Sequence, residues 1–531
     1  MPAFASDLAR LRPDEIAVRD PKQSFTWAQV GEILNRVANR VLAADLGERR
    51  RVAVFAENAA ETALAHLGCL LGSTSTVPVN FHLTAEEAAY ILVDSDSRIV
   101  FVGPETLERG IEAARLARQQ GLLIDIVGWD VSHQEVTDWS AWLEAGDASD
   151  PSLEVAPRAN LLYTSGTTGL PKGTELPPTM FAGGSTMAEH LEGMKINRFA
   201  DYGTHLVVGP MYHTGPLNGM RLLVRGVPMV ILAKFDAEST LATIQESKTE
   251  SSVMVPTHFV RLLALPDEVK AKYDVSSMKL VAHTGASCPV DVKRAMIDWW
   301  GPIFIDAYGA TEVGTTCSIS SVEWLANPGS VGRAVPPFSV LVLNDDGDEV
   351  AANTEGRLFF KDATGRGVIY PNDAEKTKAA NISPGVFTLG EIGYVNEAGY
   401  VYITDRFSDM VVSGGVNIYP AEAEQVLDEG LAQIERRAQA AVGVGADGGV
   451  AGKFPQVGPV ERDIVGAAGE AGAEENRVGA GDEREALASV VGVERDVGLE
   501  EIVGVVRAAE STGATAVGGG ENAVGVSVGA G

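Results

Sequence analysis

The sequence predicts an α/β protein with more than one domain, and three observations support this fold class. The chain has 531 residues, which is more than one hydrophobic core usually organises. Helical and strand-like hydrophobic patterns alternate as far as Ala307, and such alternation favours helices packed on sheets. After Gly329 the pattern changes to short strands joined by turns, which predicts a small β-rich subdomain.

Two helices near the N-terminus are predicted from apolar spacing and from the residues that precede them. Residues 26–43 carry apolar side chains at helical spacing, and Thr26 forms a capping box with Gln29. Thr84 and Glu87 form the same motif ahead of a helix that is expected to end near Leu92. The apolar positions of the first helix are Val30, Ile33, Leu34, Val37 and Val41.

Short apolar runs bounded by turn residues predict the strands. In chain order they span residues 51–56, 99–102, 205–208, 229–232, 252–255, 280–283 and 304–307, and in the β-rich part residues 339–343 and 357–361. The polar run from Asp345 to Asp348 contains Gly347 and is typical of a turn between two strands.

The composition limits the classes of function. A formal charge of −30 at pH 7 argues against non-specific binding to nucleic acid or to an anionic membrane, but it does not exclude ATP held by local donors and a metal ion. The three cysteines, Cys69, Cys288 and Cys317, are too few for a disulfide framework and favour a reducing cytoplasm. No signal peptide is apparent, and no transmembrane segment is expected because the longest apolar stretch contains several polar residues.

The segment from Tyr163 to Gly173 is the most informative part of the chain. Its small residues let the backbone approach an oxyanion closely, and Lys172 adds a compact positive charge that suits a phosphate. The Walker A pattern does not fit, because a glycine follows the lysine. The segment therefore predicts a different phosphate-binding loop, with a flexible surface turn as the weaker alternative. Its hydroxyl donors are Thr164, Ser165, Thr167 and Thr168.

This loop and two later motifs resemble the adenylate-forming superfamily, which includes acyl-CoA synthetases, aryl-CoA ligases, luciferases and peptide-synthetase adenylation domains. The later motifs are Tyr308-Gly309-Ala310-Thr311-Glu312 and Thr404-Asp405-Arg406, and the second is followed by a run from Ser413 to Pro420. The resemblance covers about residues 10–427. It implies an N-terminal domain over residues 1–405, with two α/β sheets and a small β-barrel-like subdomain. A small C-terminal α+β region over residues 406–531 would follow, and here it is atypical or disrupted.

The resemblance implies an AMP-forming acyl-CoA ligase. In such an enzyme a carboxylate attacks the α-phosphate of ATP, and coenzyme A then attacks the acyl carbon of the acyl-adenylate. The first step needs phosphate donors, Mg²⁺ and a lysine, and the sequence proposes no Ser–His–Asp triad. By resemblance the expected catalytic residues are Lys172, His213, Thr311 and Glu312, and the expected metal ligands are Glu312 and Thr168.

The resemblance also implies where the nucleotide binds. Tyr308 would lie along the adenine, although a core tyrosine at the end of a buried strand is a competing reading. Glu391 stands where the family has a ribose-binding aspartate, and Arg406 is expected beside it unless it forms only a surface salt bridge. The expected cofactor-binding residues are Thr164, Ser165, Gly166, Thr167, Thr168, Gly169, Lys172, Gly285, Ala286, Ser287, Asp306, Ala307, Tyr308, Gly309, Thr311, Glu391 and Arg406.

The acid is expected to bind near His213, which resembles the gate beside the carboxylate pocket in the family. Residues 211–219 and 283–286 are expected to line the acyl pocket. Their apolar and small side chains favour a fatty or aryl acid over an amino acid. The implied partners are a carboxylic acid, ATP and coenzyme A, and the phosphopantetheine of an acyl carrier protein is the alternative acceptor.

The tail departs from the family pattern after Leu427. It is acidic, and Phe454 is its only aromatic residue, so much of it is expected to lack an ordered core. The hinge position is Ser408 instead of Asp or Lys, and Gly452-Lys453 lies too early to supply the family's adenylation lysine. If that lysine is absent, the chain would be a catalytically impaired protein that still binds ATP or acyl-adenylate.

We hypothesise that this tail is an out-of-frame reading of a GC-rich gene, since Gly, Ala, Val, Arg and Glu dominate it. The nucleotide sequence tests the idea, which fails if neither other frame encodes a family-like C-terminus with a Gly-Lys pair. A genuine divergent acidic tail is the alternative.

Overall fold

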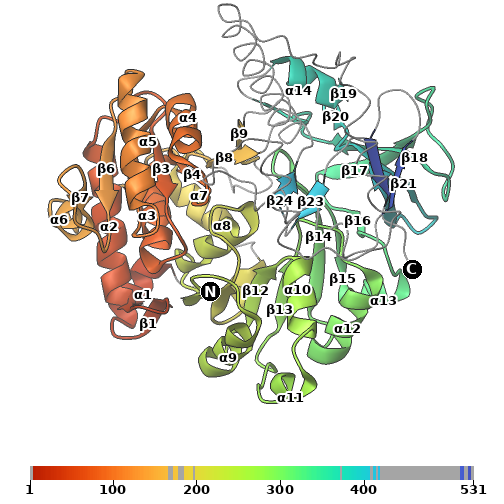
Figure 1. The fold of residues 1–531 in the computed structure, drawn as a ribbon, viewed down its shortest axis with the longest axis horizontal. Coiled ribbons are helices and arrows are strands. Elements are labelled where there is room, and N and C mark those ends of the chain that lie inside the picture. The colour runs from red at the N-terminus through yellow and green to blue at the C-terminus, as the bar shows by residue number, and fades with distance from the viewer. Residues whose placement is uncertain are drawn as a thin grey trace, which may run out of the picture. The chain divides into compact units, whose positions relative to one another are not determined.

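The computed structural model describes residues 4–164, 171–177, 184–194, 198–370, 374–406, 411–413, 416–418, 515–518 and 524–527. The chain divides into two compact units, Met1–Ala438 and Gln439–Gly531. In the second unit the described residues form one antiparallel hairpin of β25 (Thr515–Gly518) and β26 (Val524–Ser527). All other elements belong to the first unit (Figure 1).

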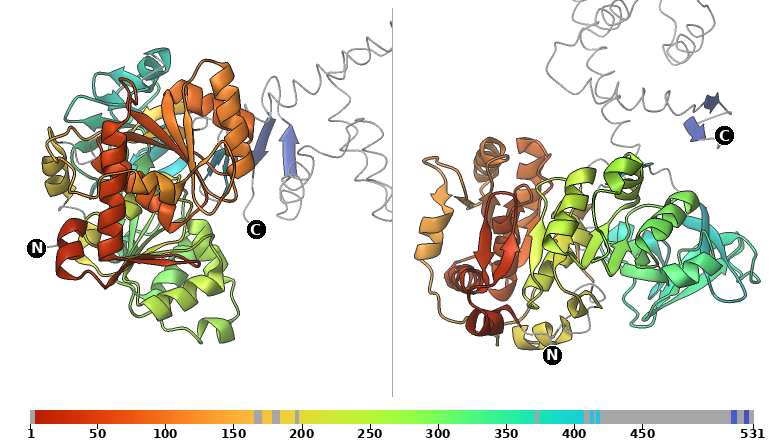
Figure 2. Two further views of the ribbon diagram at one scale, coloured as in Figure 1. Left: turned by 90° about the vertical axis from the view of Figure 1, so that its left-hand side faces the viewer. Right: turned by 90° about the horizontal axis from the view of Figure 1, so that it is seen from below.

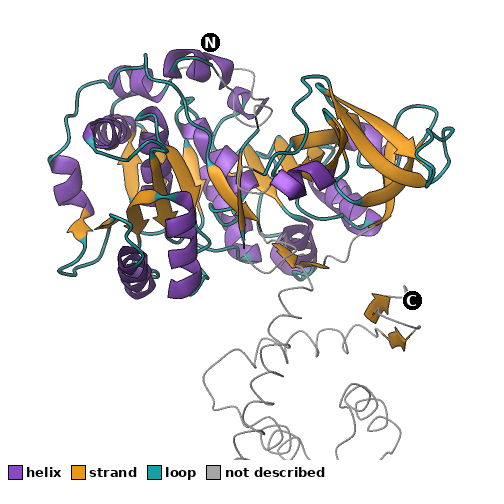
Figure 3. Ribbon diagram, turned by 90° about the horizontal axis from the view of Figure 1, so that it is seen from above, coloured by secondary structure: helices purple, strands orange, loops and turns teal. Residues whose placement is uncertain are grey.

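A five-stranded parallel sheet lies in the N-terminal part of the first unit. Its order is β4 (Ser75–Pro78), β3 (Arg51–Phe55), β5 (Ser97–Val102), β6 (Asp125–Gly128) and β7 (Thr137–Asp138). Apolar side chains of α4 (Ala85–Ser95) and α5 (Leu107–Gln119) pack on one face. The other face is covered by α2 (Trp27–Ala43), α3 (Ala60–Leu71) and α6 (Trp139–Glu144) (Figure 3). The sheet therefore has helices on both faces, as its near-continuous apolar strands require.

A nine-stranded sheet forms the centre of the unit. Its order is β16 (Arg333–Ala334), β15 (Gly314–Ser320), β14 (Phe304–Ala310), β13 (Leu280–His283), β12 (Ser251–Met254), β10 (His205–Val207), β11 (Met229–Ile231), β1 (Ile16–Arg19) and β2 (Ser24–Thr26). The strands from β14 to β1 are parallel. Beyond β14 the sheet continues through antiparallel pairing with β15 and then β16, and β2 pairs antiparallel with β1 at the other edge.

Helices cover both faces of this central sheet as well. The cluster that contains Phe259, Met296 and Trp300 places α9 (Ala237–Ser247), α10 (Pro256–Leu263) and α12 (Val290–Trp300) on one face. On the other face a second cluster joins α8 (Thr214–Met220) to α2 and α3. Every residue of α3 is buried, including Glu61 and His66, as expected for a mainly apolar helix that lies between two sheets. The two sheets lie side by side in Figure 2.

The β-rich part is an antiparallel sheet packed against the end of the central sheet. Its strands are β17 (Phe338–Leu343), β18 (Gly356–Asp362), β19 (Asn381–Ser383), β20 (Val386–Phe387), β21 (Glu391–Val395) and β22 (Val401–Arg406). Its core residues Leu358, Phe360 and Phe387 share a cluster with Val313 and Cys317 of the central sheet. The remaining connection carries α14 (Ala374–Ala380).

The sequence-based expectations for these elements are largely confirmed. Both capping boxes are present, at Thr26 with Gln29 and at Thr84 with Glu87. The predicted strands are observed with ends that shift by at most three residues, the strand over 280–283 has both ends as predicted, and Gly347 has φ +86° in the predicted turn. The two α/β sheets and the small β subdomain match the expected fold. Across the described ranges no helix is long and apolar enough to cross a membrane.

Candidate functional site

The candidate site lies at the carboxyl ends of the central parallel strands. Met254 at the end of β12 is in register with His283 at the end of β13, and His283 is in register with Asp306 on β14. Turns that leave parallel strands at one edge of a sheet form the usual ligand crevice of this architecture. Gly285 has φ +85° in the turn after β13, and the motif from Tyr308 to Glu312 closes β14. The edge therefore brings together segments that are far apart in the sequence.

The predicted phosphate loop is carried by a two-stranded hairpin. Strands β8 (Leu161–Thr164) and β9 (Lys172–Glu175) pair antiparallel, with Thr164 opposite Lys172. Tyr163 donates to Asp94 at 2.6 Å, and Tyr90 donates to the carbonyl of Pro171 at 3.2 Å, so α4 fixes both arms. Residues 165–170 lie outside the described ranges. The expected ligands Ser165, Gly166, Thr167, Thr168 and Gly169 fall there, and so does the side chain of Thr164.

The hairpin is tied to the β subdomain as well as to α4. The hydroxyl of Thr174 on β9 donates to the carbonyl of Ile369 at 3.4 Å. Ile369 belongs to the segment that links β18 to α14, so the base of the phosphate loop and this segment are in direct contact. Lys172 is half-buried on the same strand.

Thr311 is joined to the segment that carries His213. The hydroxyls of Thr311 and Thr214 lie 3.2 Å apart, within hydrogen-bonding distance. His213 is the residue before α8, and its half-buried ring packs beside Tyr212 with centroids 4.3 Å apart. Burial lowers the pKa of His213 to about 4, so its imidazole is neutral at pH 7. The structure thus joins Thr311 by one hydrogen bond to Thr214, the residue next to His213.

Glu312 is held at its carboxylate and at its backbone carbonyl by two residues that the sequence did not identify. Tyr370 donates to its Oε1 at 3.3 Å, and Arg366 donates to its backbone carbonyl at 3.1 Å. Both donors come from the segment that also contacts Thr174 through Ile369. Glu312 is half-buried, and the hydrogen bond from Tyr370 leaves lone pairs on the carboxylate for a further ligand. No local sequence signal marks Tyr370, because its role depends on contact across almost sixty residues.

Gly309 lies where no other residue fits. A bulge separates Tyr308 from Gly309 in the pairing of β14 with β15. A Cβ placed on Gly309 would stand 1.9 Å from the carbonyl oxygen of Gly314, which is backbone and cannot rotate away. We expect Gly309→Ala to lower the free energy of unfolding by about 2 kcal/mol and to disturb the adjacent Thr311 and Glu312. Thermal unfolding of Gly309→Ala beside the wild type measures the difference; an unchanged midpoint would contradict it.

Asp306, an expected cofactor-binding residue, has a protein partner. Its Oδ2 accepts from Nζ of Lys293 at 3.0 Å, and the Lys293 side chain is 1% exposed. His283 is wholly buried with Nδ1 3.7 Å from Asp306 Oδ1, and neither of its ring nitrogens has a hydrogen-bond partner among the described residues. Burial lowers the pKa of His283 to about 4 and outweighs the opposite effect of Asp306. The buried lysine thus fixes Asp306 at the strand end; sequence reasoning did not single it out.

Tyr308 makes the core contact that was the competing interpretation from sequence. Its half-buried ring packs on Phe360 with centroids 6.0 Å apart, within the core of the β subdomain. Ala307 beside it is half-buried, and so are Ala286 and Ala310. Gly285 and Ser287, in the turn after β13, are exposed. A core contact for Tyr308 is therefore present, and the turn expected to face the adenine is accessible.

The two ribose candidates are brought together by strand register. Glu391 on β21 is the Cα partner of Arg406 on β22. The side chain of Glu391 is 5% exposed. The side chain of Arg406, together with Ser408, Gly414, Gly415 and Lys453, lies outside the described residues. The pairing supports a shared location for Glu391 and Arg406, which the sequence separates by fifteen residues.

The residues present fit Mg²⁺ held partly by a nucleotide. Within the described ranges no three His, Cys, Asp or Glu side chains gather in a way that could hold a metal ion. Mg²⁺ is commonly bound by one or two carboxylates together with substrate phosphates, so a dedicated protein cage is not required. Glu312 supplies one carboxylate that a tyrosine orients, and this is the arrangement expected around such an ion.

A family model and individual proteins match the chain over most of its length. Residues 6–367 match the family described as AMP-binding enzyme. An indoleacetate–CoA ligase of Aromatoleum aromaticum is 30% identical over 432 residues, which cover 79% of this chain and 81% of the relative. The long-chain-fatty-acid–CoA ligase FadD13 of Mycobacterium tuberculosis is 30% identical over 415 residues, with 76% and 77% covered.

The fold is similar to that of solved structures. The N-terminal domain of FACL13 from Mycobacterium tuberculosis, in an inhibitor-bound crystal structure, superposes with a TM-score of 0.61 at 27% identity. That match covers 76% of this chain and 98% of the solved domain. The similarity thus extends over the three sheets that build the candidate site.

Proposed function

The chain belongs to the AMP-binding enzyme family, and from that premise we propose that it activates an apolar carboxylic acid with ATP and transfers the acyl group to coenzyme A. It is an ATP-dependent acid–thiol ligase by this relationship. The observation that carries the proposal is the meeting of three segments at one sheet edge. Thr311 bonds to Thr214 at 3.2 Å, Glu312 bonds to Tyr370 at 3.3 Å, and the Tyr370 segment contacts the phosphate hairpin.

We propose a role for each side chain in the first half-reaction. Lys172 and the hydroxyl of Thr311 would bind phosphate oxygens, because a positive charge and short donors stabilise the charge that develops on the α-phosphate. Glu312 would hold Mg²⁺, which when bound supplies charge neutralisation at the phosphates. His213 is neutral at pH 7, so we propose that it orients the substrate carboxylate by a hydrogen bond and leaves the carboxylate its full nucleophilic charge.

The substrate that we propose first is a fatty acid of medium or long chain. The buried apolar side chains Met211, Leu217 and Met220 on the His213 segment are suited to an aliphatic chain. A second candidate, an aryl acid, is favoured by aromatic rings at the same place. Phe81 lies edge-on to Tyr212 at 5.6 Å between centroids, and Tyr212 packs beside His213. The two relatives named above act on a long-chain fatty acid and on indoleacetate, one from each class.

A competition experiment tests the substrate class directly. The purified chain is given ATP, Mg²⁺, coenzyme A and an equimolar mixture of octanoate, palmitate, indoleacetate and ferulate, and products are read by mass spectrometry. Acyl-CoA from the two fatty acids in excess supports the first proposal. Aryl-CoA in excess replaces it with the second. If neither acyl-CoA nor aryl-CoA forms and ATP is not turned over, both substrate proposals are contradicted.

The acceptor is proposed to be coenzyme A, with a carrier protein as the alternative. Acyl-adenylate made by the chain can be divided between free coenzyme A and a holo acyl carrier protein present together. Preferential formation of acyl-CoA supports the proposal, and preferential loading of the carrier protein overturns it. ATP binding without acyl-adenylate would instead favour the catalytically impaired reading that the atypical tail suggested.

Removing the Tyr370 hydroxyl is expected to weaken metal binding more than it weakens the fold. Tyr370→Phe keeps the ring and deletes the 3.3 Å hydrogen bond to Glu312. Loss of an outer-shell partner costs roughly tenfold in metal affinity, so the Mg²⁺ concentration that half-saturates ATP binding should rise by about that factor. Tyr394→Phe, in the stacked pair with Tyr402 on β21 and β22, is the control. Equal Mg²⁺ dependence in the two variants would contradict the assignment.

A further inference from the structure

Asn58 crosses from the N-terminal sheet to the central sheet. It lies in the connection between β3 and α3 and is 5% exposed. Its Nδ2 donates to the carbonyl of Gly209 at 3.0 Å and to that of Leu232 at 3.1 Å. Gly209 follows β10 and Leu232 follows β11, so one amide group binds the carboxyl ends of two adjacent parallel strands.

The carbonyl oxygen of the same side chain fixes a third point. Oδ1 of Asn58 accepts from the backbone N–H of Met211 at 2.9 Å. The three hydrogen bonds use both N–H donors and the carbonyl acceptor of the Asn58 amide. Two of them bind Gly209 and Met211, on either side of Pro210. Two residues further along stands His213, whose backbone N–H donates back to the carbonyl of Pro210 at 3.1 Å. The short segment 209–213 is therefore held in a single conformation by one side chain and one turn.

We infer that Asn58 is a positioning residue for the acid subsite: it sets the place of His213 and Thr214 relative to Thr311 through its three bonds to residues 209–211 and 232. The inference rests on the proposed function, because that proposal places the substrate carboxylate at His213. Among the described residues, the side-chain hydrogen bonds of Asn58 reach Leu232 and the segment that carries His213, and not β8, β9 or Glu312. Its removal should therefore affect the acid more than ATP.

The test uses the full chain with a matched pair of variants. Asn58→Asp keeps the size and the acceptor oxygen but puts a carboxylate oxygen against two carbonyls. Asn39 on α2 also donates two hydrogen bonds from Nδ2, to the carbonyls of Asp147 and Ser149 at 2.9 and 2.8 Å, and it lies far from the site. Asn39→Asp is therefore the control for the loss of an asparagine that binds two backbone carbonyls.

The first readout is backbone hydrogen exchange in peptides that cover residues 209–217, which does not depend on activity. We expect exchange there to accelerate roughly tenfold or more in Asn58→Asp, because the carboxylate repels the carbonyls of Gly209 and Leu232 that it faces and the segment opens more often, and to stay unchanged in Asn39→Asp. The wild-type Met211 amide lies outside any helix or strand. It should nevertheless exchange slowly, because it donates a hydrogen bond to Oδ1 of Asn58. Unchanged exchange in Asn58→Asp, or rapid wild-type exchange at Met211, overturns the inference.

The second readout separates positioning from a general loss of structure. In Asn58→Asp, kcat/KM for the acid should fall by about tenfold or more while the dissociation constant for ATP changes less than about twofold. Equal losses for acid and ATP overturn the inference in favour of a purely structural role. If Asn58→Asp does not fold, Asn58→Ala, which removes the bonds without adding a charge, is measured in its place. A wild-type chain that forms no acyl-adenylate overturns the proposed function, whereas the exchange result still decides whether Asn58 holds the segment.

Discussion

Replacing Glu312 with alanine should lower kcat/KM for ATP-dependent acyl-adenylate formation by roughly 100- to 1000-fold, because the reaction loses the carboxylate proposed to hold Mg²⁺ at the phosphates. The fold should survive, since Glu312 is half-buried and its backbone contact with Arg366 does not need the side chain. Acyl-adenylate formation from ATP and the preferred acid, measured over a range of Mg²⁺ concentrations, gives the value.

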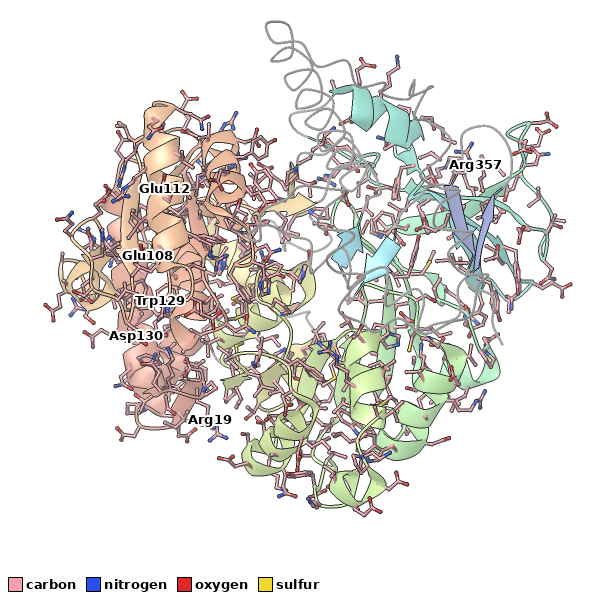
Figure 4. All side chains as sticks on the ribbon, viewed as in Figure 1. Arg19, Glu108, Glu112, Trp129, Asp130 and Arg357 are labelled. Atoms are coloured by element: carbon pink, nitrogen blue, oxygen red, sulfur yellow. The ribbon has the colours of Figure 1, made fainter. Side chains whose placement is uncertain are left out.

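Two further variants make this result specific. Glu312→Gln keeps the shape and the acceptor from Tyr370 but removes the charge, and should lose nearly as much activity as Glu312→Ala. Glu108 on α5 is an exposed glutamate on the outer layer of the N-terminal sheet (Figure 4), and Glu108→Ala should leave activity unchanged. Activity in Glu312→Ala within a few-fold of the wild type would remove Glu312 from the site.

Acidification below pH 6.5 should destabilise the first unit strongly, because this unit buries histidines in their neutral form. Burial lowers the pKa of His66 to about 3, that of His205 to about 3 and that of His283 to about 4. The unfolded chain, with an ordinary histidine pKa near 6.5, then binds protons that the folded chain does not bind. The contribution of these histidines to the free energy of unfolding is complete above pH 6.5. It is lost as the pH falls towards 4, by up to about 1.4 kcal/mol per pH unit for each histidine.

The free energy of unfolding, measured with denaturant between pH 7.5 and 5, tests this expectation. His66→Gln removes one titrating group and should make the dependence less steep by at most about 1.4 kcal/mol per pH unit. His82→Ala, a change at an exposed histidine, should leave the slope as in the wild type. A stability that is flat or rises on acidification over this range would show that these histidines are protonated in the folded protein.

The elements that repeat locally were predictable from sequence, and the contacts between them were not. The capping residues Thr26 and Thr84 identify two helices because the motif lies within four residues. The hydrogen bond from Tyr370 to Glu312 spans 58 positions in the sequence, and the one from the Met211 amide to Asn58 spans 153. No local pattern therefore marks either contact. The pairing of Glu391 with Arg406 is intermediate, since both were chosen from motifs and the strand register explains why they belong together.

The same distinction applies within the candidate site. The motif around Thr311 predicted by resemblance which side chains would face the phosphates, but it did not show that the Thr214 hydroxyl would lie 3.2 Å from that of Thr311. Asp306 was expected from its place in the motif, whereas its buried partner Lys293 comes from a helix with an ordinary amphipathic pattern. A charged residue on the apolar side of such a helix is the one signal that sequence offered for this ion pair.

Formation of AMP and acyl-CoA by the purified full chain is the most direct test of the central claim. The chain is incubated with ATP, Mg²⁺, coenzyme A and single carboxylic acids, and both products are quantified by mass spectrometry beside Glu312→Ala. The account predicts AMP and acyl-CoA in equal amounts with an apolar acid, dependent on the acid and formed roughly 100- to 1000-fold less efficiently by Glu312→Ala. Absence of acyl-adenylate and acyl-CoA with every acid, from a chain that still binds ATP, would contradict the claim that this protein is an active acid–thiol ligase.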